Sequence, residues 1–130
     1  MIDSTCQIVL FVKDKEEAKS FYTQKLGFII RDEEEFNEDW SYLTVAPHTN
    51  SEVVIELVEA VTDEEKQLIG RQAAKQVFLM FKVDDINQTY ESLKAKGVNF
   101  FGEPQEVPGG KGVCFEDLYG NKLDLFEEYS

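Results

Sequence analysis

Three polar side chains, Gln7, Glu56 and Asp124, interrupt runs of sequence that are otherwise apolar and typical of β-strands. A polar group on an apolar strand face is normally hydrogen-bonded, solvated or functional. If the carboxylates of Glu56 and Asp124 lie close together in a partly dry pocket, the pKa of one of them rises and that group can act as a general base. If they line a wet opening instead, they are solvated or hydrogen-bonded groups. The residues alone leave both interpretations open.

These side chains lie within a pattern of strand and helix that occurs twice along the chain. In each half, an apolar run typical of a strand is followed by an Asp with a Glu or Gln three residues later, which is the spacing of a helix N-terminal cap. A Gly ends each predicted helix. Asp85 and Gly97 follow Asp14 and Gly27 by 71 and 70 residues. The strand runs are Gln7–Val12 and Phe78–Val83, and the cap partners are Glu17 and Gln88.

Three further strand-like runs follow each predicted helix, so we expect each half to be a β-α-β-β-β module. They are Phe28–Arg31, Trp40–Val45 and Val53–Val58 in the first half, and Val98–Phe101, Gly112–Glu116 and Lys122–Glu127 in the second. Thr62 and Glu65 predict a short helix between the halves. We therefore expect one domain over residues 1–130, with modules at about 1–60 and about 76–130 and a linker helix at about 61–75.

Strand alternation assigns the polar residues to one face of their strands. Ile8, Leu10 and Val12 are all aliphatic, so we place them against the helix and Gln7 on the opposite face. Trp40 and Tyr42 share a face as well, where they stack on a flat or cationic ligand or pack in a core. The other groups on one face are Val9 and Phe11 with Gln7, Val54 and Val58 with Glu56, Met80 with Phe78, and Phe126 with Asp124.

Charge excludes several classes of partner. The 130 residues carry 26 Asp and Glu against 13 Lys and Arg, a formal net charge of -13. Nucleic acids and anionic membrane surfaces attract Lys and Arg, so neither is an expected partner. The longest uninterrupted apolar runs, Ile8–Val12 and Val77–Phe81, are too short to span a membrane, and no signal-peptide pattern opens the chain. We expect a cytoplasmic protein, and we interpret the acidic runs Asp32–Glu35 and Asp63–Glu65 as solvated faces.

The remaining reactive residues, one histidine and two cysteines, are more simply interpreted as residues without a catalytic role. His48 is the sole histidine and lies in the loop-like run PHTN, which is typical of a surface residue. Cys6 and Cys114 allow one disulfide, but a chain with 42% hydrophobic residues does not need one, and we expect free buried thiols. No histidine is obviously paired with either thiol for nucleophilic catalysis.

The duplicated order and several motifs resemble the glyoxalase, bleomycin-resistance and extradiol-dioxygenase superfamily, also called vicinal oxygen chelate proteins. The motifs are QIVLFVKD followed by FYTQKLGF, then FLMFKVDD, and finally DLYGNKLDLFEE. The resemblance covers nearly the whole chain. It implies an α+β fold in which two tandem βαβββ modules form a cup-shaped mixed sheet, and a homodimer, since cups in this family are commonly completed across two chains.

The resemblance also implies a ligand set. Metal-dependent members place a ligand on the first and last strands of each module, which here correspond to Gln7, Glu56, Phe78 and Asp124. Phe78 cannot bind a metal, and Asp124 is one methylene shorter than the usual glutamate. Gln7, Glu56 and Asp124 suit Mg²⁺ or Mn²⁺, whereas the absence of an imidazole from this set disfavours Ni²⁺, Zn²⁺ or Fe²⁺. In the family's isomerases a metal-bound glutamate moves the substrate proton, which implies that Glu56 is the catalytic residue.

Two functions of different classes follow from these observations. The first is a metal-free module that binds a small organic molecule in its cup, a hypothesis that the aromatic Phe78 favours. Its expected ligand-binding residues are Phe11, Trp40, Tyr42, Phe78, Met80 and Phe126. The second is a lyase or isomerase that uses a divalent metal, which Gln7, Glu56 and Asp124 favour. Extradiol dioxygenase chemistry is less favoured because the chain offers no pair of histidines with a carboxylate. We expect the binding module and leave enzyme activity open.

Overall fold

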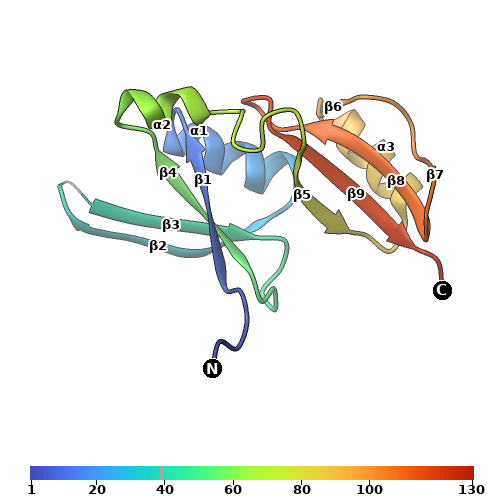
Figure 1. Ribbon diagram of the computed structural model, residues 1–130, viewed down its shortest axis with the longest axis horizontal. Coiled ribbons are helices and arrows are strands. Elements are labelled where there is room, and N and C mark those ends of the chain that lie inside the picture. Colours follow the sequence, from blue (N-terminus) through green and yellow to red (C-terminus); the bar gives the residue numbers. More distant parts are fainter. Residues whose placement is uncertain (39) are drawn as a thin grey trace. The chain divides into compact units, whose positions relative to one another are not determined.

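Asp14 and Asp85 each begin a helix in the computed structural model, which describes residues 1–38 and 40–130 (Figure 1). The Asp14 carboxylate accepts a hydrogen bond at 3.0 Å from the backbone N–H three residues later, and Asp85 does the same at 3.1 Å. Thr62 begins a third helix with a complete capping box to Glu65. These bonds satisfy N–H groups that have no partner within the helix, and all three predicted helix starts are confirmed.

The chain separates into two compact units, Met1–Ile69 and Gly70–Ser130. The first unit contains a four-stranded sheet with the order β1-β4-β3-β2, in which β1 and β4 are parallel and the other pairs are antiparallel. Its elements are β1 (Gln7–Val12), α1 (Lys15–Ser20), the π-helical turn η1 (Phe21–Lys25), β2 (Ile29–Asn37), β3 (Trp40–Ala46), β4 (Val54–Glu59) and α2 (Asp63–Leu68).

The second unit repeats this topology. Its sheet has the order β5-β9-β8-β6, with β7 paired to β8, and β5 and β9 are parallel. Its elements are β5 (Val77–Lys82), α3 (Ile86–Ala95), β6 (Asn99–Phe100), β7 (Gln105–Val107), β8 (Gly110–Glu116) and β9 (Lys122–Glu128). The fold is therefore α+β with mixed sheets, as the sequence predicts.

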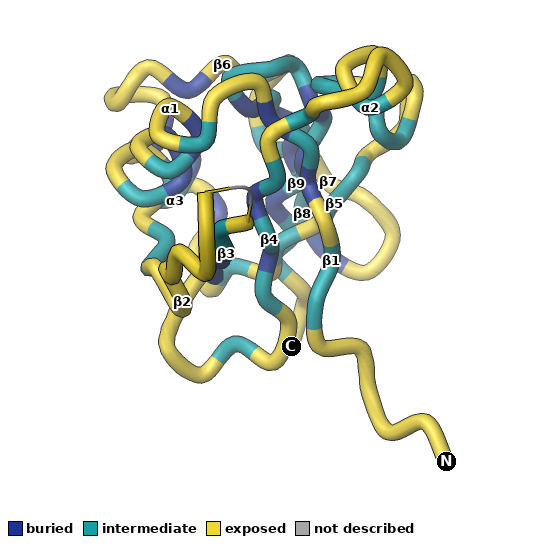
Figure 2. Tube along the Cα trace, turned by 90° about the vertical axis from the view of Figure 1, so that its left-hand side faces the viewer, coloured by how far each residue is buried: buried dark blue, intermediate teal, exposed yellow. Residues whose placement is uncertain are grey.

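Each unit has its own apolar core between a helix and one sheet face. In the first unit Leu10 of β1 pairs with Leu57 of β4, and both side chains are fully buried together with Tyr22 of η1. In the second unit Ile86 of α3 and Leu123 of β9 are fully buried. Burying one such side chain stabilises the fold by roughly 1.5–3 kcal/mol. Figure 2 shows buried segments along β4, β8 and β9, in contrast to the exposed N-terminal residues.

The acidic run Asp32–Glu35 corrects one sequence-based expectation. The strand that we expect to end at Arg31 continues to Asn37 as β2, and the carboxylates lie on it, exposed to solvent. An edge strand whose faces meet water accommodates charge, and pairing with β3 supplies its backbone hydrogen bonds. A second difference is the short strand β7, which pairs with the start of β8. Among the described residues no helix is both long and apolar enough to cross a membrane.

Candidate functional site

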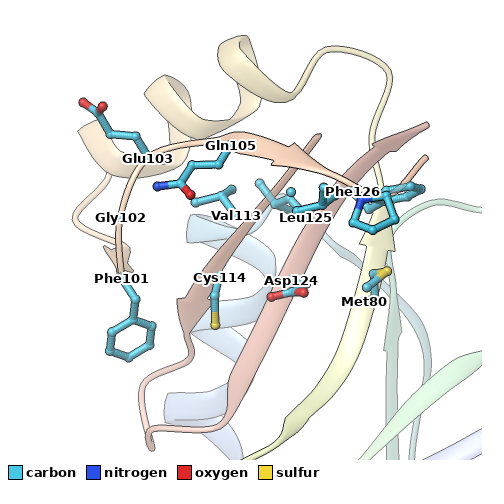
Figure 3. A pocket seen from close by; sticks show the side chains of 13 residues that line it. Met80, Phe101, Gly102, Glu103, Gln105, Val113, Cys114, Asp124, Leu125 and Phe126 are labelled. Carbon is cyan, nitrogen blue, oxygen red and sulfur yellow. The ribbon is translucent and has the colours of Figure 1, made fainter. Parts of the chain in front are cut away.

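A pocket of about 600 Å³ opens on one face of the second sheet (Figure 3). Asp124 of β9 is paired with Met80 of β5 on one side and with Cys114 of β8 on the other, so the three side chains share a face. Figure 3 shows all three at the pocket, with Phe101 and Phe126 toward its ends. This volume lies in the range of small-molecule sites.

The pocket is mostly apolar, with a few polar groups. Met80, Phe101, Val107 and Phe126 provide much of the apolar lining, and Met80 and Phe101 are more than half exposed. The polar side chains that line it are Glu103, Gln105, Cys114 and Asp124, and no Lys, Arg or His is among the lining residues. An apolar pocket with a few convergent polar groups is the usual form of a small-molecule site.

Asp124 and Cys114 influence each other across the β8–β9 pair. Burial raises the pKa of the Asp124 carboxyl, and a hydrogen bond from the Cys114 side chain lowers it in part. Burial also raises the pKa of the Cys114 thiol, and the negative charge of Asp124 raises it further. Both causes favour the neutral thiol, which is a poor nucleophile. Cys114 therefore serves as a small, weakly polar lining residue beside a carboxylate.

Phe78 lies at an irregularity in β5. Val77 pairs with Lys122 and Leu79 with Leu123, so Phe78 is an extra residue in the register. It is half-buried, and it is not among the residues that line the pocket. Of the ligand-binding residues expected in the second half, Met80 and Phe126 line the pocket and Phe78 does not.

In the first unit, Gln7, Tyr42 and Glu56 form a hydrogen-bonded chain. The Gln7 Nε2 donates to Glu56 Oε1 at 2.9 Å, and the Tyr42 hydroxyl donates to Gln7 Oε1. The β-sheet register explains this proximity, because Glu56 pairs with Val9 of β1 and with Thr44 of β3. Burial raises the pKa of the Tyr42 hydroxyl, and the negative charge of Glu56 adds to the shift. We call these three residues the Gln7 trio.

Phe11 and Trp40 have different environments. Phe11 is half-buried and lies on the same strand face as Gln7. Trp40 is 55% exposed at the start of β3 and stacks on Phe36, with ring centroids 4.2 Å apart and an interplanar angle of 24°. Trp40 therefore stacks on Phe36, although it lies on the same strand as Tyr42.

Three other residues complete the comparison with the sequence. His48 is exposed in a loop, as expected, and its Nδ1 accepts a hydrogen bond from the Asn50 backbone N–H at 3.1 Å. Cys6 and Cys114 are both free, but Cys6 is exposed and Cys114 is only half-buried, so the expectation of buried thiols is wrong. Cys6 belongs to the exposed segment before β1, where no core element covers it.

A tight transition-metal site does not fit the donors present. Among residues 1–38 and 40–130, no group of three or more His, Cys, Asp or Glu side chains could hold a metal ion. The Gln7 Oε1, which is the amide atom that binds a cation, already accepts the Tyr42 hydrogen bond. Phe78 offers no donor. The oxygen set Gln7, Glu56 and Asp124 for Mg²⁺ or Mn²⁺ stays a prediction, and we derive no reaction step through a metal.

Most residues that line the pocket were not found from the sequence, and those with a polar or aromatic side chain among them are Phe101, Glu103, Gln105 and Cys114. Cys114 could have been predicted as a pocket residue, because antiparallel pairing of its strand with the next one places it opposite Asp124. The other three lie in or beside the connection between β6 and β7, whose course no periodic pattern predicts.

Residues 5–125 match the family described as Glyoxalase/Bleomycin resistance protein/Dioxygenase superfamily, and the chain therefore belongs to this superfamily. A protein of Shewanella frigidimarina, described as uncharacterized, is 37% identical over 128 residues, which cover 98% of this chain and 95% of the relative. The family match agrees with the tandem modules that the resemblance implies and with the repeated strand order of the two units.

Two of the named proteins with similar solved structures are UcmS2 and TnmS3. The crystal structure of UcmS2 is 32% identical, with a TM-score of 0.84, and the match covers 97% of this chain and 98% of UcmS2. TnmS3 from Streptomyces sp. CB03234, described as an antibiotic binding protein, is 24% identical, with a TM-score of 0.78 and 98% of each chain covered. At 24% identity the likeness to TnmS3 concerns the fold.

Proposed function

We propose that this protein binds a small organic molecule in the pocket of its second unit. The observation that carries the proposal is an apolar pocket of about 600 Å³ with Asp124 and Cys114 pointing into it. Phe101, Met80 and Phe126 provide the contact surface for a flat or aliphatic ligand. TnmS3, described as an antibiotic binding protein, has a similar fold, which is consistent with this use of the architecture.

The sign of charge around the pocket restricts the ligand. Asp124 and Glu103 are the lining residues with carboxylates, and no basic residue is among the lining set. A carboxylate only accepts hydrogen bonds when it is ionised. The ligand is therefore neutral or cationic and directs a hydrogen-bond donor toward Asp124.

The test uses three probes of nearly equal size: 2-naphthylmethylamine, 2-naphthalenemethanol and 2-naphthoate. Their binding is measured at neutral pH by saturation-transfer difference NMR and titration. The amine and the alcohol should bind, and the carboxylate should bind about tenfold more weakly than the amine because Asp124 repels it. Equal affinity for the amine and the carboxylate would contradict the charge assignment.

A pair of variants locates the site. Met80→Ala combined with Phe101→Ala removes two exposed lining side chains, so the fold should be unaffected, and binding of the alcohol should weaken about tenfold. Phe36→Ala removes an exposed aromatic ring of the first unit and serves as the matched control. The proposal fails if the double variant binds the alcohol as the original protein does.

We also propose that two copies of the chain form a homodimer, since symmetric pairing is the commonest assembly of soluble proteins. Sedimentation equilibrium should give about twice the chain mass of 14.9 kDa. A mass that stays at the single-chain value across the accessible concentrations would refute the dimer.

A further inference from the structure

Lys122 is a half-buried lysine at the edge of the pocket in the second unit. It is the first residue of β9, and strand alternation places its side chain on the same sheet face as Asp124 and Phe126, which line the pocket. Its Nζ lies 5.8 Å from the centroid of the Phe101 ring, which belongs to another lining residue. The ammonium group of Lys122 is therefore beside the end of the pocket at which Figure 3 shows Phe101.

The charge of Lys122 has no carboxylate partner within the protein. Among the described residues, the ion pairs are formed by Lys19 and Lys82, and none by Lys122. Glu116 is opposite Lys122 in the β8–β9 register, but its Oε1 accepts a hydrogen bond of 2.8 Å from Asn99 of β6, on the other side of β8. A half-buried positive charge thus stays available in a chain where 26 acidic residues outnumber 13 basic ones.

The Phe101 ring does not take the place of a carboxylate. Its face attracts the ammonium but accepts no ordinary hydrogen bond, so the N–H donors of Lys122 remain for an acceptor. The charge also acts inside the pocket. Burial raises the pKa of the Cys114 thiol, and the positive charge of Lys122 lowers it in part. A charge that acts on a lining residue also acts on a ligand in the same pocket.

Three side chains of different character follow one another along this face of β9. Phe126, Asp124 and Lys122 are every second residue of the strand, so the Cα atoms of neighbours in this row are about 6.7 Å apart. Their side chains are apolar, negative and positive in that order. A ligand that lies along the row is complementary to it when an apolar part is followed by a hydrogen-bond donor and then by an anionic group.

We propose that the pocket takes a zwitterion, in which a protonated amine lies between an apolar part and a carboxylate. The amine contacts Asp124, the apolar part contacts Phe126, and the carboxylate contacts Lys122, which is the specificity-determining residue. This inference rests on the proposed function of the pocket, and a zwitterion has the net neutral charge expected there. A ligand with the anionic group alone gains Lys122 but meets the like charge of Asp124.

The decisive probes are N-(2-naphthylmethyl)-β-alanine and N-propyl-2-naphthylmethylamine. Both have the naphthyl ring and a protonated secondary amine with a three-carbon chain, but only the β-alanine derivative ends this chain in a carboxylate. Their affinities are measured by NMR titration at neutral pH and low salt. The β-alanine derivative should bind about tenfold more tightly, because hydrogen bonds between ionised groups are among the strong ones. Added salt should reduce this preference, since Lys122 is partly solvated.

Two variants and a control assign the preference to Lys122. Lys122→Gln should make the affinities of the two probes equal without weakening the binding of the propyl amine. Lys122→Arg keeps the charge and should retain most of the preference. Lys96→Gln removes a positive charge from an exposed position at the end of α3 and should retain all of it. Circular dichroism confirms that each variant is folded.

The outcomes separate this inference from the proposed function. If the propyl amine binds in the pocket and the carboxylate adds no affinity, the zwitterion is refuted and the proposed function stands. A preference that persists in Lys122→Gln, or that falls equally in Lys96→Gln, would refute the role of Lys122. If neither probe binds, the proposed function fails and this inference fails with it.

Discussion

Asp124 is a titratable residue of the pocket whose pKa the surrounding protein shifts. Burial raises its pKa above the ordinary value, so the folded state binds its proton more tightly than the unfolded state does. The stabilisation that this group provides is present below the ordinary aspartate pKa and is lost as the pH rises through the raised value.

The substitution Asp124→Asn removes the loss of stability that accompanies ionisation of this carboxyl. At pH 7 the variant should have a higher free energy of unfolding than the original protein, by less than about 1 kcal/mol because the carboxyl is partly solvated. Urea denaturation at a series of pH values measures the difference, which should disappear at a pH below the ordinary aspartate range. A variant that is less stable at pH 7 would show that hydrogen bonds to the ionised carboxylate outweigh its burial.

Gly70 is a position where the backbone leaves no room for a side chain. Its φ is +74°, and an added Cβ would lie 1.9 Å from the carbonyl oxygen of Tyr119. Gly70→Ala should therefore reduce the free energy of unfolding by about 3 kcal/mol, from the clash together with the left-handed backbone. Circular dichroism in urea measures this loss.

The matched control is Gly27→Ala. Gly27 has a similar φ of +76°, but nothing lies within 4 Å of an added Cβ. This variant should lose about 1 kcal/mol, which is the conformational cost alone. Equal losses in the two variants would mean that the contact with Tyr119 relaxes without cost.

At the residue scale, the sequence predicted the strand face on which a side chain lies better than it predicted the hydrogen-bond partner of that side chain. Alternation along the strands correctly placed Met80, Asp124 and Phe126 on one face. It could not predict that Tyr42 would bond to Gln7, because these residues are 35 apart and their contact depends on the order of strands in the sheet. The roles of Glu56 and Asp124 in catalysis or metal binding stay predictions.

At the scale of secondary-structure elements, the local sequence predicts most reliably where a helix begins. Asp85→Ala should reduce the free energy of unfolding by about 1 kcal/mol, since it removes the side chain that caps α3. Asp84→Ala removes the same charge one residue earlier, where the side chain does not cap the helix, and should change stability by less than half as much. Thermal unfolding followed by circular dichroism compares them, and equal losses would argue for a general charge effect.

Strand ends were less predictable than helix starts. β2 extends through the acidic run because its partner β3 continues alongside it, and partner length is a non-local property. The irregularity at Phe78 was missed for a related reason, since an extra residue is visible only in the pairing of β5 with β9. Local caps and alternation therefore predict the helices and the longer strands, whereas pairing decides where strands end and adds the short strand β7.

The formal net charge of -13 affects the molecule as a whole. Like charges repel more in the compact state than in the expanded chain, so screening should stabilise the fold. Raising the NaCl concentration from about 10 mM to about 300 mM shortens the Debye length from roughly 30 Å to below 10 Å. The melting temperature in scanning calorimetry should rise by about 3–5 °C.

Tetramethylammonium chloride at the same ionic strength separates screening from specific cation binding. The melting temperature should rise equally in both salts if screening is the cause. A rise with Na⁺ alone would indicate a bound cation, and no rise in either salt would show that the repulsion is already balanced by ion pairs such as that of Lys19 with Glu33.

The stack of Trp40 on Phe36 has a spectroscopic consequence. Trp40 is the sole tryptophan of the chain and is already 55% exposed in the folded state. Its fluorescence reports the surroundings of β2 and β3 in the first unit, while the apolar core of each unit contains no tryptophan at all. A fluorescence melt therefore reports directly on the β2–β3 pair of the first unit, whereas circular dichroism reports on the backbone of both units.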